Sequence, residues 1–110
     1  MAAPYVPAAG DIVWIDFNPQ AGHEQSGHRP AVVLSPAAYN SKAGLIVCCP
    51  TTTRIKGYPF EVGLSGQPRT VALADRVKSF DWRTRKATRK EQATAGELAE
   101  IRAKLRALVG

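Results

Sequence analysis

Short apolar runs, separated by glycine, proline and polar residues, limit the possible folds of this chain more than any other feature of its sequence. Runs of this length and composition are typical of β-strands. Strands are predicted at residues 12–17, 30–34, 45–49, 57–62 and 70–74, and residues 77–82 are expected to continue the same sheet. In the first run apolar side chains fall on both faces, which is typical of a barrel or a covered sheet rather than a one-sided sheet.

The C-terminal segment changes to a helical pattern. Thr94 and Glu97 have the spacing of a capping box, in which each side chain accepts a hydrogen bond from the other residue's amide. The apolar residues that follow recur at helical spacing, so we expect them to face the core. These residues are Leu98, Ile101, Leu105 and Leu108.

A shorter helical turn is predicted at residues 35–40, with Ser35 as its cap and Pro36 at its first helical position. Together these elements predict an α+β domain that is mostly β. Its five or six short strands would form a small, strongly curved sheet closed by one late helix.

The size and composition fit a single globular domain spanning residues 1–110. The 110 residues are 45% hydrophobic and 22% charged, so a core can form without disulfides or a structural metal. Cys48 and Cys49 are adjacent, and on a strand they would point to opposite faces as small buried side chains. No secretory signal or membrane-spanning run is visible, so we expect a cytoplasmic protein.

The formal net charge of +6 favours encounters with polyanions, although charge alone does not distinguish a nucleic acid from an acidic protein or an anionic lipid. Seven of the fifteen basic residues lie between residues 76 and 90, where a solvated surface would give the same pattern. They are Arg76, Lys78, Arg83, Arg85, Lys86, Arg89 and Lys90.

Two polar clusters border the apolar runs and hold the candidate catalytic residues. Arg29 lies just ahead of the run at residues 31–34, separated from it by Pro30, and its planar guanidinium could bind two phosphate oxygens, although a surface ion pair is the alternative. Residues 51–53 are three threonines after the run at 45–49, where an ordinary strand end is the alternative. Strand alternation places Thr52 opposite Thr51 and Thr53, so at most two of these hydroxyls can join one site.

A general base would come from the loop before Arg29. Glu24 is the carboxylate of that loop, and His23 and His28 are alternative bases. Their spacing matches no metal motif, so we expect neither a metal nor a cofactor. RNA can be cleaved without a metal when its 2′-hydroxyl attacks the adjacent phosphate, which leaves a 2′,3′-cyclic phosphate and a 5′-hydroxyl.

The sequence resembles the MazF/PemK family of toxins, the endoribonuclease partners in bacterial toxin–antitoxin pairs. The most specific segment is Gly27-His28-Arg29-Pro30-Ala31-Val32-Val33-Leu34-Ser35. Further matching segments lie at residues 5–7, 10–14, 24–26, 56–62 and 71–75, so the resemblance spans essentially the whole chain. It implies an SH3-like β-barrel of five to seven short strands with a C-terminal helix, working as a homodimer.

The resemblance also implies metal-independent, sequence-selective cleavage of single-stranded RNA, mainly messenger RNA. By motif position, the family's catalytic residues fall on Arg29, Thr52 and Glu24. Base selectivity is expected in the loops and beside the catalytic residues. The candidate substrate-binding residues are Gln25, His28, Asn40, Thr53, Lys56 and Gln67.

The partners implied by the resemblance are a cognate antitoxin, whose acidic tail lies across the RNA groove, and operator DNA bound through the toxin–antitoxin complex. Two other functions stay open. A related class of toxins with this barrel poisons DNA gyrase, and fold alone does not decide function. A non-catalytic nucleic-acid-binding module would bind in a salt-dependent way without cleavage. The presence of both Arg29 and Thr52 favours the ribonuclease.

Overall fold

The computed structural model describes residues 4–17, 28–66 and 68–110. These residues form seven strands and two helices. They are β1 (Asp11–Asp16), β2 (His28–Val33), α1 (Ala37–Ala43), β3 (Leu45–Thr52), β4 (Glu61–Leu64), β5 (Thr70–Leu73), β6 (Lys78–Asp81), β7 (Thr88–Gln92) and α2 (Ala95–Val109).

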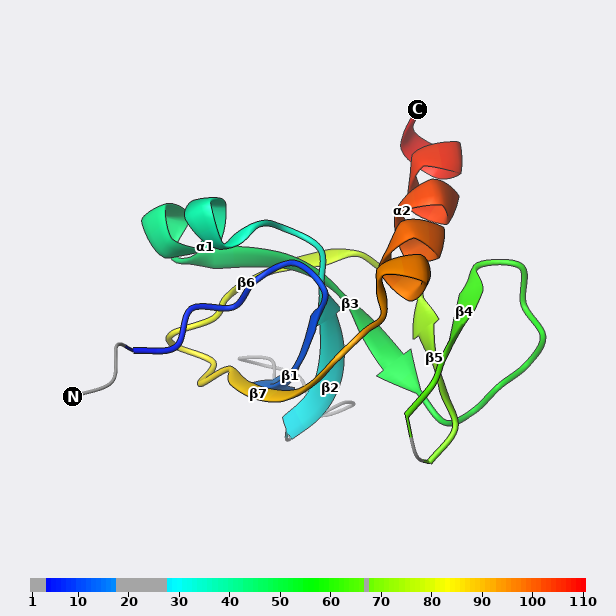
Figure 1. Cartoon of the computed structure of the whole chain (residues 1–110), viewed down its shortest axis with the longest axis horizontal. Helices are drawn as coiled ribbons and strands as arrows, with labels where there is room; N and C mark the ends of the chain where they lie inside the picture. The colour runs from blue at the N-terminus through cyan, green and yellow to red at the C-terminus, as the bar shows by residue number, and fades with distance from the viewer. Residues whose placement is uncertain (1–3, 18–27, 67) are drawn as a thin grey trace.

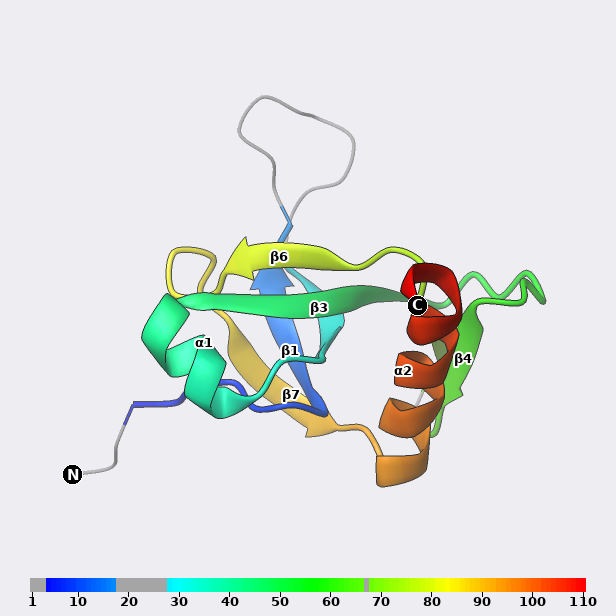
Figure 2. The same cartoon turned by 90° about the horizontal axis from the view of Figure 1, so that it is seen from above.

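The strands form one curled antiparallel sheet in the order β4-β5-β3-β2-β1-β7, with β6 paired to β3. β3 is the longest strand, and it pairs with β6 through its N-terminal half and with β5 through its C-terminal end. Figure 1 shows α2 standing beside β4 and β5, and Figure 2 shows α1 and α2 at opposite ends of β3. This architecture confirms the predicted mostly β, SH3-like fold with a C-terminal helix.

The core lies on both faces of the sheet, as the first apolar run predicted. Ile12 packs in one cluster of buried side chains, whereas Val13 and Ile15 pack in the other. Cys49 and Cys48 divide between the same two clusters, and both are free thiols. Burial raises the pKa of each thiol to about 12, so both stay protonated and unreactive at neutral pH.

α2 begins at the predicted capping box. The Thr94 hydroxyl accepts from the Glu97 amide at 3.1 Å, and the Glu97 carboxylate accepts from the Thr94 amide at 2.9 Å. Ile101 is fully buried, but Leu108 is 52% exposed, so the prediction that Leu108 faces the core is wrong. The cause is visible in Figure 1, where the last turns of α2 extend beyond the strands that cover its first turns.

Two predicted boundaries are also wrong, and one strand was not predicted. Ser35 does not cap α1: its hydroxyl donates to Asn40 Oδ1 at 2.6 Å and accepts from the Val47 amide at 2.9 Å. The strand expected from residue 57 begins only at Glu61, because residues 53–60 form a loop. β7 was not predicted, because its sequence contains no apolar residue and, among the strands that the structure describes, it is an edge strand paired with β1 alone. No helix among the described residues is long and apolar enough to cross a membrane.

Candidate active site

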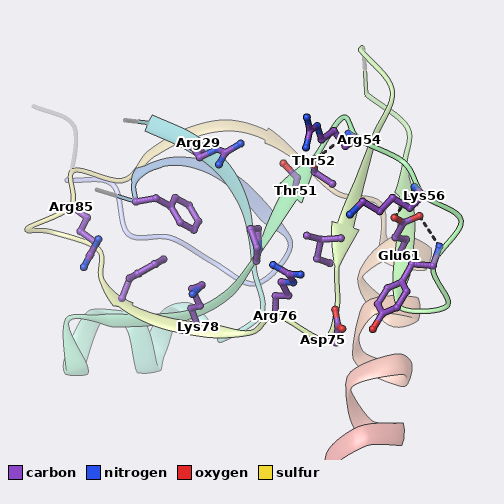
Figure 3. Close-up of a pocket in the computed structure, with 15 residues that line it drawn as sticks. Arg29, Thr51, Thr52, Arg54, Lys56, Glu61, Asp75, Arg76, Lys78 and Arg85 are labelled. Carbon is purple, nitrogen blue, oxygen red and sulfur yellow. Dashed lines mark hydrogen bonds between the residues drawn. The ribbon is translucent and has the colours of Figure 1, made fainter. Parts of the chain in front are cut away.

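A groove of about 910 Å³ runs along the ends of β2, β3 and β5 and past β6. Six basic side chains line it against two acidic ones, so the groove is strongly positive and suits a polyanion. The basic residues are Arg29, Arg54, Lys56, Arg76, Lys78 and Arg85, and the acidic residues are Glu61 and Asp75. Figure 3 shows these side chains arranged around the same space, with Arg85 at one end and Lys56 and Glu61 at the other.

Arg29 and Thr52 both line this groove, although they come from different strands. The antiparallel register of β2 and β3 pairs Ala31 with Pro50. Two residues further on, Arg29 and Thr52 reach the same end of the strand pair. Figure 3 shows the Arg29 guanidinium directed toward the end of β3 that carries Thr52. A cation and a hydroxyl on two hydrogen-bonded strands can hold one phosphate between them.

The three threonines differ in exposure and in hydrogen bonding. Thr51 is 7% exposed and donates its hydroxyl proton to the Pro30 carbonyl at 3.2 Å. Thr52 is half-buried, and its hydroxyl oxygen accepts from the Arg54 amide at 3.0 Å, which leaves the hydroxyl proton available to a ligand. Thr53 is exposed and does not line the groove. Thr52 is therefore the threonine best placed to bind a phosphate oxygen.

One end of the groove is aromatic as well as basic. Phe17 and Phe80 contact each other edge to face, with ring centroids 5.0 Å apart. The Arg85 guanidinium lies 4.3 Å from the centre of the Phe80 ring and donates to the Asp16 carbonyl at 2.9 Å. Aromatic rings with an arginine stacked over them are typical of surfaces that bind unpaired bases.

Asp75 lines the groove just after β5. Its Oδ1 atom is buried, and within the described residues no hydrogen-bond donor reaches it. A buried acceptor without a partner is unfavourable, so this oxygen is suited to an N–H group of a bound ligand.

The other predicted site residues do not all meet in the groove. Lys56 lines it, whereas His28 is exposed on β2 and is not among the lining residues. Glu24, Gln25 and Gln67 lie outside the described residues. In the described ranges no group of three His, Cys, Asp or Glu side chains could hold a metal ion.

The prediction that Asn40 contacts the substrate is wrong, because this side chain is completely buried. Its amide donates to the Pro7 carbonyl at 2.7 Å and to the Ser35 carbonyl at 2.9 Å. The backbone carbonyl of Asn40 accepts from the Trp82 indole at 2.8 Å. Asn40 therefore ties the N-terminal segment, α1 and the end of β6 together.

Sequence reasoning missed most of the groove's basic and aromatic residues. Arg76, Lys78 and Arg85 belong to the basic stretch that the sequence drew attention to, and the structure brings these three into the groove. Arg83 is directed elsewhere: its guanidinium lies 4.7 Å from the Trp82 ring centre and donates to the Ser41 carbonyl. The curl of the sheet decides which of these basic side chains reach the groove. No local sequence pattern predicts that curl.

Comparisons with known proteins agree with this fold. Residues 8–109 match the family model of the PemK-like, MazF-like toxin of type II toxin–antitoxin systems. The endoribonuclease toxin MazF of Escherichia coli K12 is 58% identical over 111 residues, which cover 100% of both chains. The endoribonuclease toxin ChpB of the same strain is 35% identical over 107 residues, with 91% of each chain covered.

Solved structures show the same relationship. The crystal structure of MazF from Deinococcus radiodurans superposes with a TM-score of 0.88 at 56% identity, covering 97% of this chain and 99% of that one. A MazE–MazF crystal structure from the same organism gives a TM-score of 0.90 at 56% identity, covering 97% of this chain and 98% of the other. The chain therefore belongs to the PemK-like, MazF-like toxin family of type II toxin–antitoxin systems.

Proposed function

We propose that this protein is the toxin of a toxin–antitoxin pair and that it cleaves single-stranded RNA, mainly messenger RNA, in the basic groove. The observation that carries this proposal is that Arg29 and Thr52, from two paired strands, line one positively charged groove. Two relatives with high sequence coverage carry the name endoribonuclease, which supports the same activity here.

In the proposed reaction the ribose 2′-hydroxyl attacks the adjacent phosphorus, and the bond from phosphorus to the 5′-oxygen breaks. Glu24 takes the 2′-hydroxyl proton, with His28 as the alternative base. Arg29 neutralises the charge that develops on the equatorial phosphate oxygens, and the Thr52 hydroxyl donates to one of them. The departing 5′-oxygen takes up a proton from water, so the products are a 2′,3′-cyclic phosphate and a 5′-hydroxyl, and no step requires a metal.

The rest of the groove would hold the strand on either side of the cut. Lys78 and Arg76 lie opposite Arg29 in Figure 3, where they can follow the phosphate backbone. Phe17 and Phe80 offer ring surfaces for an unpaired base. The buried Asp75 Oδ1 atom can accept an N–H of a base, which would make it selective for bases with a donor at that edge.

The proposed partners are a second copy of this chain and an antitoxin with an acidic tail that competes for the basic groove. The MazE–MazF structure from Deinococcus radiodurans supports an antitoxin partner. A second cavity of about 360 Å³ is lined by the apolar side chains of Leu34, Val47, Leu105 and Val109 together with Ser35, Arg102 and Arg106. Val109 is 72% exposed, and Leu108, also in the last turn of α2, is 52% exposed. These side chains give the homodimer a suitable interface. Operator DNA would be bound through the antitoxin complex, in the cytoplasm.

The test is to incubate the purified protein with a single-stranded RNA in excess EDTA and to determine the chemistry of the new ends. We expect cleavage at preferred sequences, with 2′,3′-cyclic phosphate and 5′-hydroxyl ends. An RNA with a 2′-deoxy nucleotide at the cut should resist, because it lacks the nucleophile. Intact RNA together with trapped gyrase–DNA complexes would instead identify a gyrase poison, and salt-sensitive binding without cleavage would identify a non-catalytic module.

A further inference from the structure

The loop between β3 and β4, residues 53–60, forms one wall of the groove without support from the core. Three of its residues line the groove, namely Arg54, Lys56 and Tyr58. Residues 53–59 are nevertheless all exposed, and residues 54–58 have no regular secondary structure. Burial therefore does not fix the conformation of this wall, and polar contacts must do so.

The Glu61 carboxylate supplies three of those contacts, in addition to the Glu61 amide, which donates to the Tyr58 carbonyl at 3.0 Å. Its Oε2 atom accepts from the Lys56 amide at 3.0 Å, and its Oε1 atom accepts from the amides of Gly57 at 3.0 Å and Tyr58 at 3.3 Å. Gly57 has a φ of 75°, a left-handed conformation that turns successive amides toward one acceptor and that side chains disfavour. Hydrogen bonds to an ionised carboxylate are stronger than those between neutral groups.

Glu61 is itself held by regular structure. It is the first residue of β4 and pairs with Leu73 on β5. Its backbone carbonyl accepts from the Lys104 ammonium at 2.9 Å, and Lys104 also pairs with Glu100 one turn earlier on α2, at 3.3 Å. The residue that carries the carboxylate is thus fixed to the sheet and to α2. The loop has other ties only near its two ends in the described residues, where the Arg54 amide donates to the Thr52 hydroxyl and the Phe60 carbonyl accepts from the Ala74 amide. Figure 3 shows Glu61 reaching back from β4 toward the loop beside Lys56.

We propose that Glu61 is a positioning residue for RNA selection: by holding three consecutive loop amides it sets where Lys56 and Tyr58 meet the RNA. This inference rests on the proposed ribonuclease function and adds to it the residue that shapes the selective wall. Glu61 does not touch the reacting phosphate in this scheme, and it acts through the loop. Loss of the Glu61 carboxylate should therefore weaken RNA binding and reduce the selectivity between bases. The rate of the chemical step at Arg29 and Thr52 should stay nearly the same.

The test is Glu61→Gln, which keeps the shape of the side chain but replaces one acceptor oxygen with an NH₂ donor. Whichever way the amide turns, at least one loop N–H then faces a donor and loses its bond. For a preferred RNA we expect KM to rise roughly tenfold with kcat nearly unchanged. The ratio of kcat/KM between that RNA and one with a single altered base beside the cut should shrink. Amide hydrogen exchange at residues 56–58 should become faster in the free protein.

Glu100→Gln is the matched control, because it removes the same charge from the other partner of Lys104 without touching the loop. We expect wild-type KM, base preference and amide exchange from it. A double-mutant cycle with Lys56→Gln tests whether Glu61 acts through Lys56. If it does, the increase in KM in the double variant should be smaller than the two single-variant effects combined.

The two proposals fail in different ways. If the wild-type protein cleaves no RNA, the ribonuclease function fails, and the exchange measurement still tests whether Glu61 orders the loop. If the wild type cleaves but Glu61→Gln keeps its KM and base preference, the positioning role is contradicted. A variant that only lowers the melting temperature, with unchanged exchange at residues 56–58 below that temperature, contradicts it as well.

Discussion

Arg29 owes its potential as a catalytic group to the strand that carries it. The next residues of β2, Ala31 to Val33, are completely buried, and Arg29 pairs with Ile15 on β1. The backbone of Arg29 is therefore fixed by the core, while its guanidinium reaches the groove. A cation placed in this way needs little reorganisation when charge develops on a phosphate, which is the condition for strong transition-state stabilisation.

The hydroxyl of Thr52 can be tested with a variant of nearly the same shape. Thr52→Val should lower the single-turnover cleavage rate about 10²-fold, because it removes one donor to the phosphate. Circular dichroism and melting temperature should stay close to the wild type. Thr53→Val is the control, since Thr53 is exposed and lies outside the groove. Equal cleavage rates for the two variants would contradict the proposed role of the Thr52 hydroxyl in the active site.

Asn40 provides a prediction about stability rather than activity. Asn40→Ala removes the donor to the buried Ser35 carbonyl and the acceptor of the Ser35 hydroxyl proton, so we expect the free energy of unfolding to fall by about 1–3 kcal/mol. The folded fraction should cleave RNA as the wild type does. Urea unfolding measures the loss of stability. A large loss of cleavage activity in fully folded Asn40→Ala would instead indicate that Asn40 does contact the substrate.

At the scale of single elements, the sequence predicted what local patterns encode. The capping box at Thr94 and the apolar runs of β1, β3 and β5 are local signals, and each gave an element close to its true position. β7 has no such signal, because an edge strand with charged residues is defined by its partner β1 rather than by its own apolar pattern. The same limit applies to Asn40, whose acceptor at Pro7 lies 33 residues away.

The cap of α2 can be tested by substitution. Thr94→Ala removes the acceptor for the Glu97 amide and should lower the free energy of unfolding by about 1 kcal/mol. For a domain of this size that corresponds to a fall of about 4–8 °C in melting temperature. Thermal unfolding followed by circular dichroism measures it. An unchanged melting temperature would mean that the cap contributes nothing, despite its geometry.

At the scale of the whole molecule, the curl of the sheet produces the groove. Arg29 on β2 is distant in sequence from Arg76 after β5, Lys78 on β6 and Arg85 before β7, yet all four line one surface. The resemblance to a known family could assign Arg29 and Thr52 from motif position, because these residues lie in specific segments. The remaining cations could not be assigned, since a basic stretch does not reveal which of its side chains the curl turns inward.

The charge of the groove predicts strongly salt-dependent RNA binding. For an RNA blocked by a 2′-deoxy nucleotide at the cut, the logarithm of the binding constant should fall linearly with the logarithm of salt concentration. Lys78→Gln should reduce the slope by about 0.7, the value for one phosphate contact on a single strand. Fluorescence anisotropy at several salt concentrations measures this slope. A slope that Lys78→Gln leaves unchanged would place the RNA elsewhere on the molecule.

The most direct test of the account compares Arg29→Ala with Arg69→Ala in the cleavage of single-stranded RNA in excess EDTA. Arg69 is exposed and lies outside the groove, so both variants lose one positive charge but only one loses it from the site. Arg29→Ala should remain folded and cleave about 10²–10³-fold more slowly, whereas Arg69→Ala should keep the wild-type rate. Folded Arg29→Ala that cleaves RNA at the wild-type rate would contradict the assignment of this groove as the active site.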